Sequence, residues 1–114
     1  MTTCEHGSAQ VFTELSDCGM ELTIRVAGSF DFSLHPDFQR AYQNFSPSPK
    51  CYSVDLSETS YLDSAALGML LLLRDHCYGD GSRAEAQRVE LVNPRPHVAN
   101  ILAASNFDRI FTIR

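Results

Sequence analysis

Hydrophobic and polar residues alternate along the segment from Met20 to Gly28. The four apolar residues are expected on one face: Met20, Leu22, Ile24 and Val26. The three polar residues are expected on the other: Glu21, Thr23 and Arg25. A period of two predicts a strand with one buried and one solvated face. A shorter strand candidate, residues 10–15, precedes it across the turn-like sequence 16–19, so the two are expected to form an antiparallel hairpin.

The apolar spacing changes to that of a helix in three later segments. A first helix is predicted over residues 34–45, and the prolines in 46–50 end it. Its apolar residues fall on one stripe: Leu34, Phe38, Ala41, Tyr42 and Phe45. A second helix is predicted from Ser64 to about Tyr78, with three leucines packed on Val54 and Val89 of the sheet: Leu67, Leu70 and Leu71. A third helix falls within residues 94–107, with apolar residues at helical spacing: Val98, Ile101 and Leu102.

Short, largely apolar segments between these helices are predicted to be strands. They span residues 51–56, 88–93 and 109–114, whereas 57–61 has the composition of a turn and 79–87 that of a polar loop. The resulting order is β-β-α-β-α-β-α-β, which indicates an α/β fold with a mixed, mostly parallel sheet. We expect residues 1–114 to form one domain, with residues 1–8 flexible.

Composition narrows the class of protein. With 114 residues, 44% apolar and 20% charged, the chain resembles a globular domain, and its net charge of −5 argues against a nucleic-acid ligand. Its longest apolar run, residues 65–73, is too short to span a bilayer. No secretory signal begins the sequence, so a cytoplasmic location is expected.

The four cysteines, Cys4, Cys18, Cys51 and Cys77, are expected to be thiols. No pair has Cys-x-x-Cys spacing, and Cys51 and Cys77 lie in core-like segments where they should react slowly with alkylating agents. The only candidate metal ligands that lie close together in the sequence are Cys4 with His6 and His76 with Cys77. We therefore predict neither a metal nor a cofactor.

An Asp-Ser pair, Asp63 and Ser64, comes directly before the most apolar predicted helix. Either residue could cap that helix by accepting a bond from a free backbone N–H. A serine nucleophile at such a turn needs Gly-x-Ser-x-Gly, but Leu62 and Ala66 hold the flanking positions here, which disfavours an enzyme. A phosphate on Ser64 would suit the positive end of the helix dipole, so capping and phosphorylation both remain open.

The segment that contains this pair, VDLSETSYLDSAALGMLLLLRD, resembles STAS domains of the anti-sigma factor antagonist family. Eight residues match the family pattern in place: Asp55, Leu56, Ser57, Leu62, Asp63, Ser64, Leu67 and Gly68. VAGSFDF is similar to the end of the family's second strand through Gly28, Phe30 and Asp31, and residues 91–113 resemble its tail. The resemblance runs from about Val11 to Ile113 and implies the STAS fold.

The resemblance also implies a function. It suggests a bacterial partner-switching regulator of transcription, phosphorylated at Ser64 by a serine kinase that is also an anti-sigma factor and reset by a phosphatase. The implied partner-binding residues are Asp31, Asp63, Ser64, Ala65 and Ala66, of which Ala65 and Ala66 replace the family's usual Ser/Thr and Gly. The alternative is a STAS subunit of a lipid-transport (ABC transporter) complex, a class that usually lacks the Asp-Ser phosphosite.

Overall fold

The computed structural model of the chain describes residues 10–43, 50–78 and 88–114. Their strands are β1 (Gln10–Leu15), β2 (Glu21–Phe30), β3 (Cys51–Asp55), β4 (Thr59–Leu62), β5 (Arg88–Val92) and β6 (Thr112–Ile113). Their helices are α1 (His35–Gln43), α2 (Ser64–Tyr78) and α3 (Pro96–Ala104), with 3-10 turns η1 (Phe32–Leu34) and η2 (Phe107–Arg109). The expectations for residues 1–8, Phe45 and the loop 79–87 lie outside the described residues.

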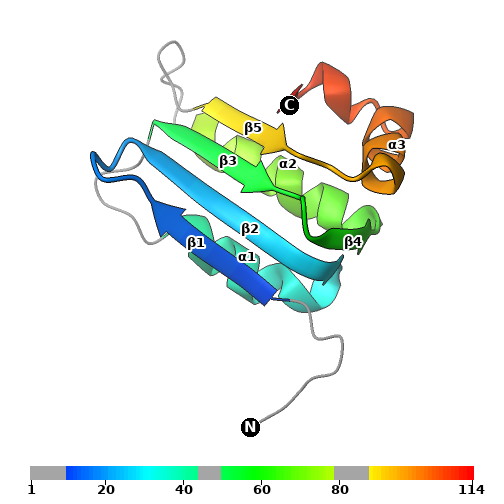
Figure 1. Cartoon of the computed structure of the whole chain (residues 1–114), viewed down its shortest axis with the longest axis horizontal. Helices are drawn as coiled ribbons and strands as arrows, with labels where there is room; N and C mark the ends of the chain where they lie inside the picture. The colour runs from blue at the N-terminus through cyan, green and yellow to red at the C-terminus, as the bar shows by residue number, and fades with distance from the viewer. Residues whose placement is uncertain (1–9, 44–49, 79–87) are drawn as a thin grey trace, which may run out of the picture.

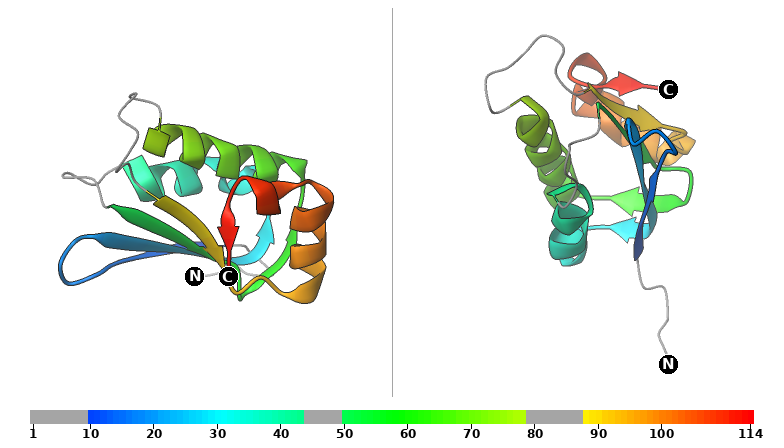
Figure 2. Two further views of the ribbon diagram at one scale, coloured as in Figure 1. Left: turned by 90° about the horizontal axis from the view of Figure 1, so that it is seen from above. Right: turned by 90° about the vertical axis from the view of Figure 1, so that its left-hand side faces the viewer.

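One mixed sheet forms the centre of the fold (Figure 1), with strand order β1-β2-β3-β5-β6. β1 and β2 pair in antiparallel fashion as a hairpin, and the other neighbours are parallel. Helices α1 and α2 lie side by side on one face of this sheet, and α3 packs near its end (Figure 2). The prediction of a mostly parallel α/β fold is confirmed.

Strand β2 is long enough to pair with two strands, one after the other along its length. Its first half pairs with β3, and its last residues pair with β4 after a register shift between Gly28 and Ser29. Gly28 has φ +92°, a backbone conformation that favours glycine. The shift lets β2 extend beyond the main sheet and carry β4 with it.

The prediction of a turn at residues 57–61 is right for Ser57 and Glu58 but wrong for the rest, because Thr59–Leu62 forms strand β4. The Thr59 hydroxyl donates to the Val26 carbonyl at 2.7 Å, and the Gly28 N–H donates to the Glu58 carbonyl at 2.9 Å. These bonds come from β2, so the local sequence of β4 gave no sign of them. The last strand, predicted over 109–114, spans only Thr112–Ile113, because η2 extends to Arg109 and the N–H groups of Ile110 and Phe111 donate to the Phe107 carbonyl at 3.1 and 2.9 Å.

The core lies between the sheet and the two helices α1 and α2. The apolar face of β2 is fully buried at Leu22, Ile24 and Val26, whereas Met20 lies before the strand and is 46% exposed, contrary to its predicted place. From the helices the buried side chains are Phe38, Tyr42, Ala66, Met69, Leu70 and Leu73. The packing of β3 and β5 under α2 agrees with the prediction, through Val54 and Val89.

The predicted inward face of α2 needs a correction. Leu70 is completely buried and Leu67 is partly buried, but Leu71 is 38% exposed. Successive helical residues point about 100° apart, so a helix that buries Ala66, Leu70 and Leu73 must turn Leu71 towards solvent. No helix in the described residues is both long enough and apolar enough to cross a membrane.

Candidate functional site

The ends of β2 and β4 bring two separate segments of the chain together. Phe30 and Leu62, the last residues of the two strands, are register partners, and the Asp63 N–H approaches the Phe30 carbonyl at 3.4 Å. Asp31 and Asp63 are the next residues along each chain segment. The structure thus assembles Asp31 and the Asp63-Ser64 pair at one end of the sheet.

Asp63 is the residue that caps α2. Its Oδ1 accepts a hydrogen bond from the Ala66 N–H at 3.0 Å, and its carbonyl accepts one from the Leu67 N–H at 3.1 Å. A capping side chain of this kind stabilises a helix by about 1 kcal/mol. The choice that the sequence left open between Asp63 and Ser64 as the cap is therefore decided in favour of Asp63.

Ser64 is the first residue of α2, and its side chain is exposed. No hydrogen bond joins its hydroxyl to any of the described residues, because Asp63 already performs the capping. A free hydroxyl in the first turn of a helix faces the positive end of the helix dipole, which favours an anion by about 0.3–1 kcal/mol. The arrangement can accept a phosphate without breaking an existing contact.

The Asp31 carboxylate is held by two serines. Its Oδ1 accepts hydrogen bonds from the Ser33 hydroxyl at 2.6 Å and the Ser33 N–H at 3.0 Å, and its Oδ2 accepts one from the Ser29 hydroxyl at 3.4 Å. The bond from the Ser33 hydroxyl is the main cause that lowers the pKa of Asp31 below its ordinary value. Asp31 therefore presents a fixed negative charge beside the start of α2.

The two alanines at the predicted partner surface differ in accessibility. Ala65 is half-buried, whereas Ala66 is completely buried, so a partner cannot contact the Ala66 side chain in this structure. The methyl group of Ala66 is part of the core between α2 and the sheet. Gly68, one turn after Ser64, is exposed and has open space around it.

An exposed apolar surface that was not expected from the sequence lies on α2 beyond Ser64. We call Gly68, Leu71 and Leu72 the α2 crest; its two leucines are 38% and 46% exposed. Helical spacing places these residues in line with Ser64 on the solvent side of α2. Phe32, which follows Asp31, is 70% exposed and stacks on His35. A run of five apolar residues, 69–73, was the available signal, because a helix that packs one face on a sheet leaves some positions of such a run exposed.

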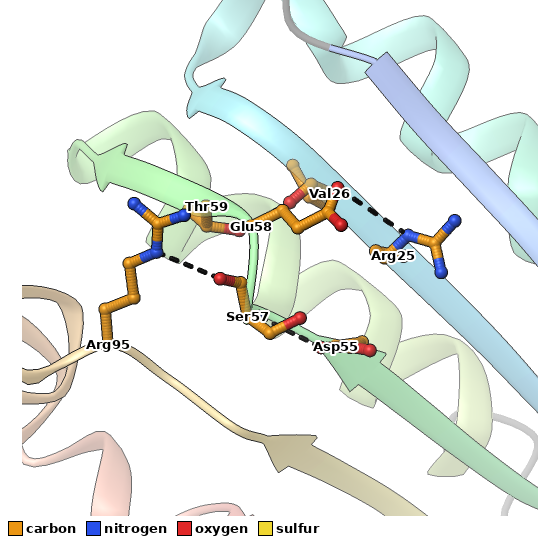
Figure 3. Close-up of polar contacts among 7 residues, drawn as sticks. All are labelled: Arg25, Val26, Asp55, Ser57, Glu58, Thr59 and Arg95. Carbon is orange, nitrogen blue, oxygen red and sulfur yellow. Dashed lines mark hydrogen bonds and ion pairs between the residues drawn. The ribbon is translucent and has the colours of Figure 1, made fainter.

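The loop that leads into β4 is anchored from both sides, as Figure 3 shows. The Arg95 Nε donates to the Ser57 carbonyl at 2.9 Å, and the Ser57 N–H donates to Asp55 Oδ1 at 2.9 Å. From β2, Arg25 Nε lies 4.0 Å from Glu58 Oε1. These contacts fix the position of β4, and through it the start of α2. Arg95 was not singled out from the sequence.

Side chains that could bind a metal do not gather in the described part of the chain: it contains no group of three or more His, Cys, Asp or Glu in reach of one ion. His76 contacts the Tyr42 ring at 5.0 Å between centroids, and His97 stacks on Tyr61 at 6.0 Å. Cys4, His6 and the Cys77 side chain lie outside the described residues. The expectation of no metal and no cofactor stays a prediction.

A sheet with two helices on one face, and a serine exposed where a short strand passes into the second helix, defines a small α/β domain of the STAS type. The chain belongs to the STAS-domain family: a family model described as "Mlab, STAS domain" matches residues 14–113. A STAS-domain containing protein of Pseudomonas aeruginosa is 50% identical over 95 residues, which cover 83% of this chain and 89% of that protein.

Solved structures support the same fold. An anti-sigma factor antagonist from Mycobacterium paratuberculosis superposes with a TM-score of 0.72 at 18% identity, covering 97% of this chain and 89% of that chain. The anti-sigma factor antagonist SpoIIAA in its unphosphorylated form gives a TM-score of 0.69 at 17% identity, with 92% and 88% of the two chains covered. At these identities the likeness establishes the fold, and the predicted STAS fold is confirmed.

Proposed function

We propose that this protein is a partner-switching regulator that acts like an anti-sigma factor antagonist. In its unphosphorylated form it binds an anti-sigma factor that is also a serine kinase, and phosphorylation of Ser64 releases it. A phosphatase then restores the binding form. The observation that carries this proposal is the exposed Ser64 hydroxyl, which has no structural bond while Asp63 caps the helix. Such a role needs no catalytic residue and no cofactor, and sigma factors act in the cytoplasm.

The fold should tolerate the phosphate. Phosphorylation adds about −1.5 to −2 charges at neutral pH. At the N-terminus of α2 these charges meet free backbone N–H groups and the positive end of the dipole, which stabilise an anion. No hydrogen bond within the described residues has to break, because none involves the Ser64 hydroxyl.

The same charge should disrupt an interface with the partner. A partner that packs over Ser64 and the α2 crest would bury the phosphate beside Asp31 and Asp63. Burying a charge without a compensating partner costs several kcal/mol, and each 1.4 kcal/mol corresponds to a tenfold loss of affinity. The pKa of Asp31 is lowered, so this carboxylate stays charged and cannot relieve the repulsion by taking up a proton near neutral pH.

The experiment that tests the proposal begins with co-expression of the chain and a serine kinase encoded near its gene. Mass spectrometry should find the phosphate on Ser64. Binding titrations against that kinase should show wild-type affinity for Ser64→Ala and a loss of at least tenfold for Ser64→Glu. Asn100→Glu adds the same charge at an exposed position of α3 and serves as the control that should bind normally. Equal binding of Ser64→Glu and wild type, with Ser64 unmodified, would refute the proposal.

The alternative from the sequence, a subunit of a lipid-transport complex, makes a different prediction in the same experiment. The chain would then co-purify with the ATPase of a transporter, and Ser64 would remain unmodified in cells. The exposed and unbonded state of Ser64 favours the regulatory role, because a serine needed only as a helix cap would have occupied the position that Asp63 takes.

A further inference from the structure

Strand β1 forms an outer edge of the sheet (Figure 1). It pairs with β2 in an unbroken register from Gln10↔Ala27 to Leu15↔Leu22, and no described segment pairs with its other side. Proteins usually protect such an edge with proline, lysine or a bulge. The sequence QVFTEL contains neither residue, and the β1–β2 register contains no bulge. The outer backbone groups of β1 are therefore available to another strand.

A cleft runs beside this edge between β1 and α1. It has a volume of about 270 Å³ and is lined by Val11, Thr13, Asp37, Arg40 and Ala41. Val11 and Thr13 reach it because they pair with Val26 and Ile24, whose side chains are buried on the helix-covered face. Leu15 shares that face but is 42% exposed at the end of the strand. The edge thus offers both a recess with a mixed polar and apolar lining and an uncovered apolar side chain.

We propose that a second copy of this chain pairs with β1 in antiparallel fashion, around a two-fold axis at Thr13. Opposite residues in an antiparallel pair lie on the same face of the sheet. With Thr13 on the axis, Leu15 of the second copy stands opposite Val11 and enters the cleft, and Phe12 stands opposite Glu14. An axis at Glu14 would oppose two carboxylates, and an axis at Phe12 would leave Leu15 outside the pairing, so Thr13 is the favoured centre.

The charged residues on the rim of the cleft, Arg40 and Asp37, can complement the same two residues of a second copy. Arg40 and Asp37 form an ion pair at 2.7 Å, and their side chains are 62% and 56% exposed. An isologous interface brings the same surface to both sides, so each copy presents one cation and one anion to the other. This mixed rim opposes the repulsion expected from the net charge of −5 on each chain. A single shared strand pair buries little surface, so we expect a weak dimer.

This dimer is separate from the proposed switch. Ser64 follows β4, which pairs with the last residues of β2 beyond the stretch that pairs with β3. None of the residues that line the cleft belongs to the site at Asp31 and Asp63. Dimer formation and partner release can therefore be measured independently of one another.

A disulfide across the axis tests both the pairing and its register. In a background with Cys4→Ser and Cys18→Ser, Thr13→Cys would place two thiols on directly opposite residues, with Cα atoms about 4.5–5.5 Å apart, which a disulfide can bridge. Oxidation should give a covalent dimer that a reductant reverses. Glu14→Cys is the control, because its two copies would lie roughly 8 Å apart in this register, too far for a disulfide. Equal cross-linking of both variants, or of neither, would overturn the proposed register.

Sedimentation of the unmodified chain provides the second test. The apparent mass should rise towards that of a dimer as the concentration increases from about 10 µM to about 1 mM. Thr13→Lys places two like charges at the axis and should keep the chain monomeric, while Thr112→Lys on the exposed part of β6 should behave as wild type. Circular dichroism would confirm that both variants remain folded. A wild-type chain that stays monomeric at every concentration would refute the dimer.

Discussion

Phe30 and Leu62 stand opposite each other at the ends of two parallel strands, β2 and β4. Both side chains are buried in the core, at 0% and 1% exposure, so the strand ends are fixed. Each residue is followed by an aspartate, and the pairing places Asp31 beside Asp63 and the start of α2. A contact between two core residues therefore determines the geometry of the proposed phosphorylation site.

Leu70→Ala should lower the free energy of unfolding by roughly 2–5 kcal/mol, since it removes a completely buried side chain and leaves a cavity. Leu71→Ala is the matched control: its side chain is 38% exposed, so the loss should be well below that range. Urea denaturation of the two variants measures both values. A larger loss for Leu71→Ala than for Leu70→Ala would show that the orientation of α2 is wrong.

Asp63→Ala should lower the free energy of unfolding by about 1 kcal/mol, because the Ala66 N–H loses its acceptor. Asp63→Asn keeps an oxygen at the same place and should retain most of the stability. Ser64→Ala should change the melting temperature little, since no described residue depends on its hydroxyl. Thermal unfolding of the three variants, followed by circular dichroism, measures these melting temperatures. A larger loss of stability for Ser64→Ala than for Asp63→Ala would show that Ser64, and not Asp63, caps the helix.

Ser33→Ala should raise the pKa of Asp31, because the Ser33 hydroxyl is the main cause of its lowered value. A carboxylate with a lowered pKa in the folded state stabilises the fold above its unfolded pKa, and this contribution disappears as the pH falls through the folded pKa. The variant should therefore lose less stability than wild type on acidification. NMR titration of the Asp31 carboxyl carbon measures the shift directly, and an unchanged midpoint would contradict the assignment.

Cys18 should react with iodoacetamide faster than Cys51 in the folded protein. Cys18 is exposed in the turn between β1 and β2, and a hydrogen bond with the Ser16 hydroxyl, 3.6 Å from Sγ, lowers the pKa of its thiol. Cys51 is half-buried at the start of β3. Ser16→Ala should slow the labelling of Cys18 near neutral pH by reducing its thiolate fraction. Peptide mass spectrometry at timed intervals distinguishes the sites.

The sequence by itself determined the elements whose evidence is local. Alternation from Met20 to Gly28 predicted β2, because a strand shows opposite faces at successive residues. Helical spacing and the Asp63-Ser64 pair predicted where α2 begins, because the free N–H groups of a helix end are satisfied by nearby side chains. The resemblance of this segment to STAS domains then indicated the fold that the structure and the family match confirm.

Tertiary structure alone decided the features that depend on distant partners. Thr59–Leu62 is a strand because β2 extends past Gly28 and supplies its hydrogen bonds, which no local pattern reveals. Within the leucine run of α2, the packing of the helix on the sheet buries Leu70 and exposes Leu71. Asp31 meets Asp63 only through the pairing of Phe30 with Leu62. Hydrophobic periodicity reports which residues lie on a common face, but the choice of neighbours is made by segments far apart in the chain.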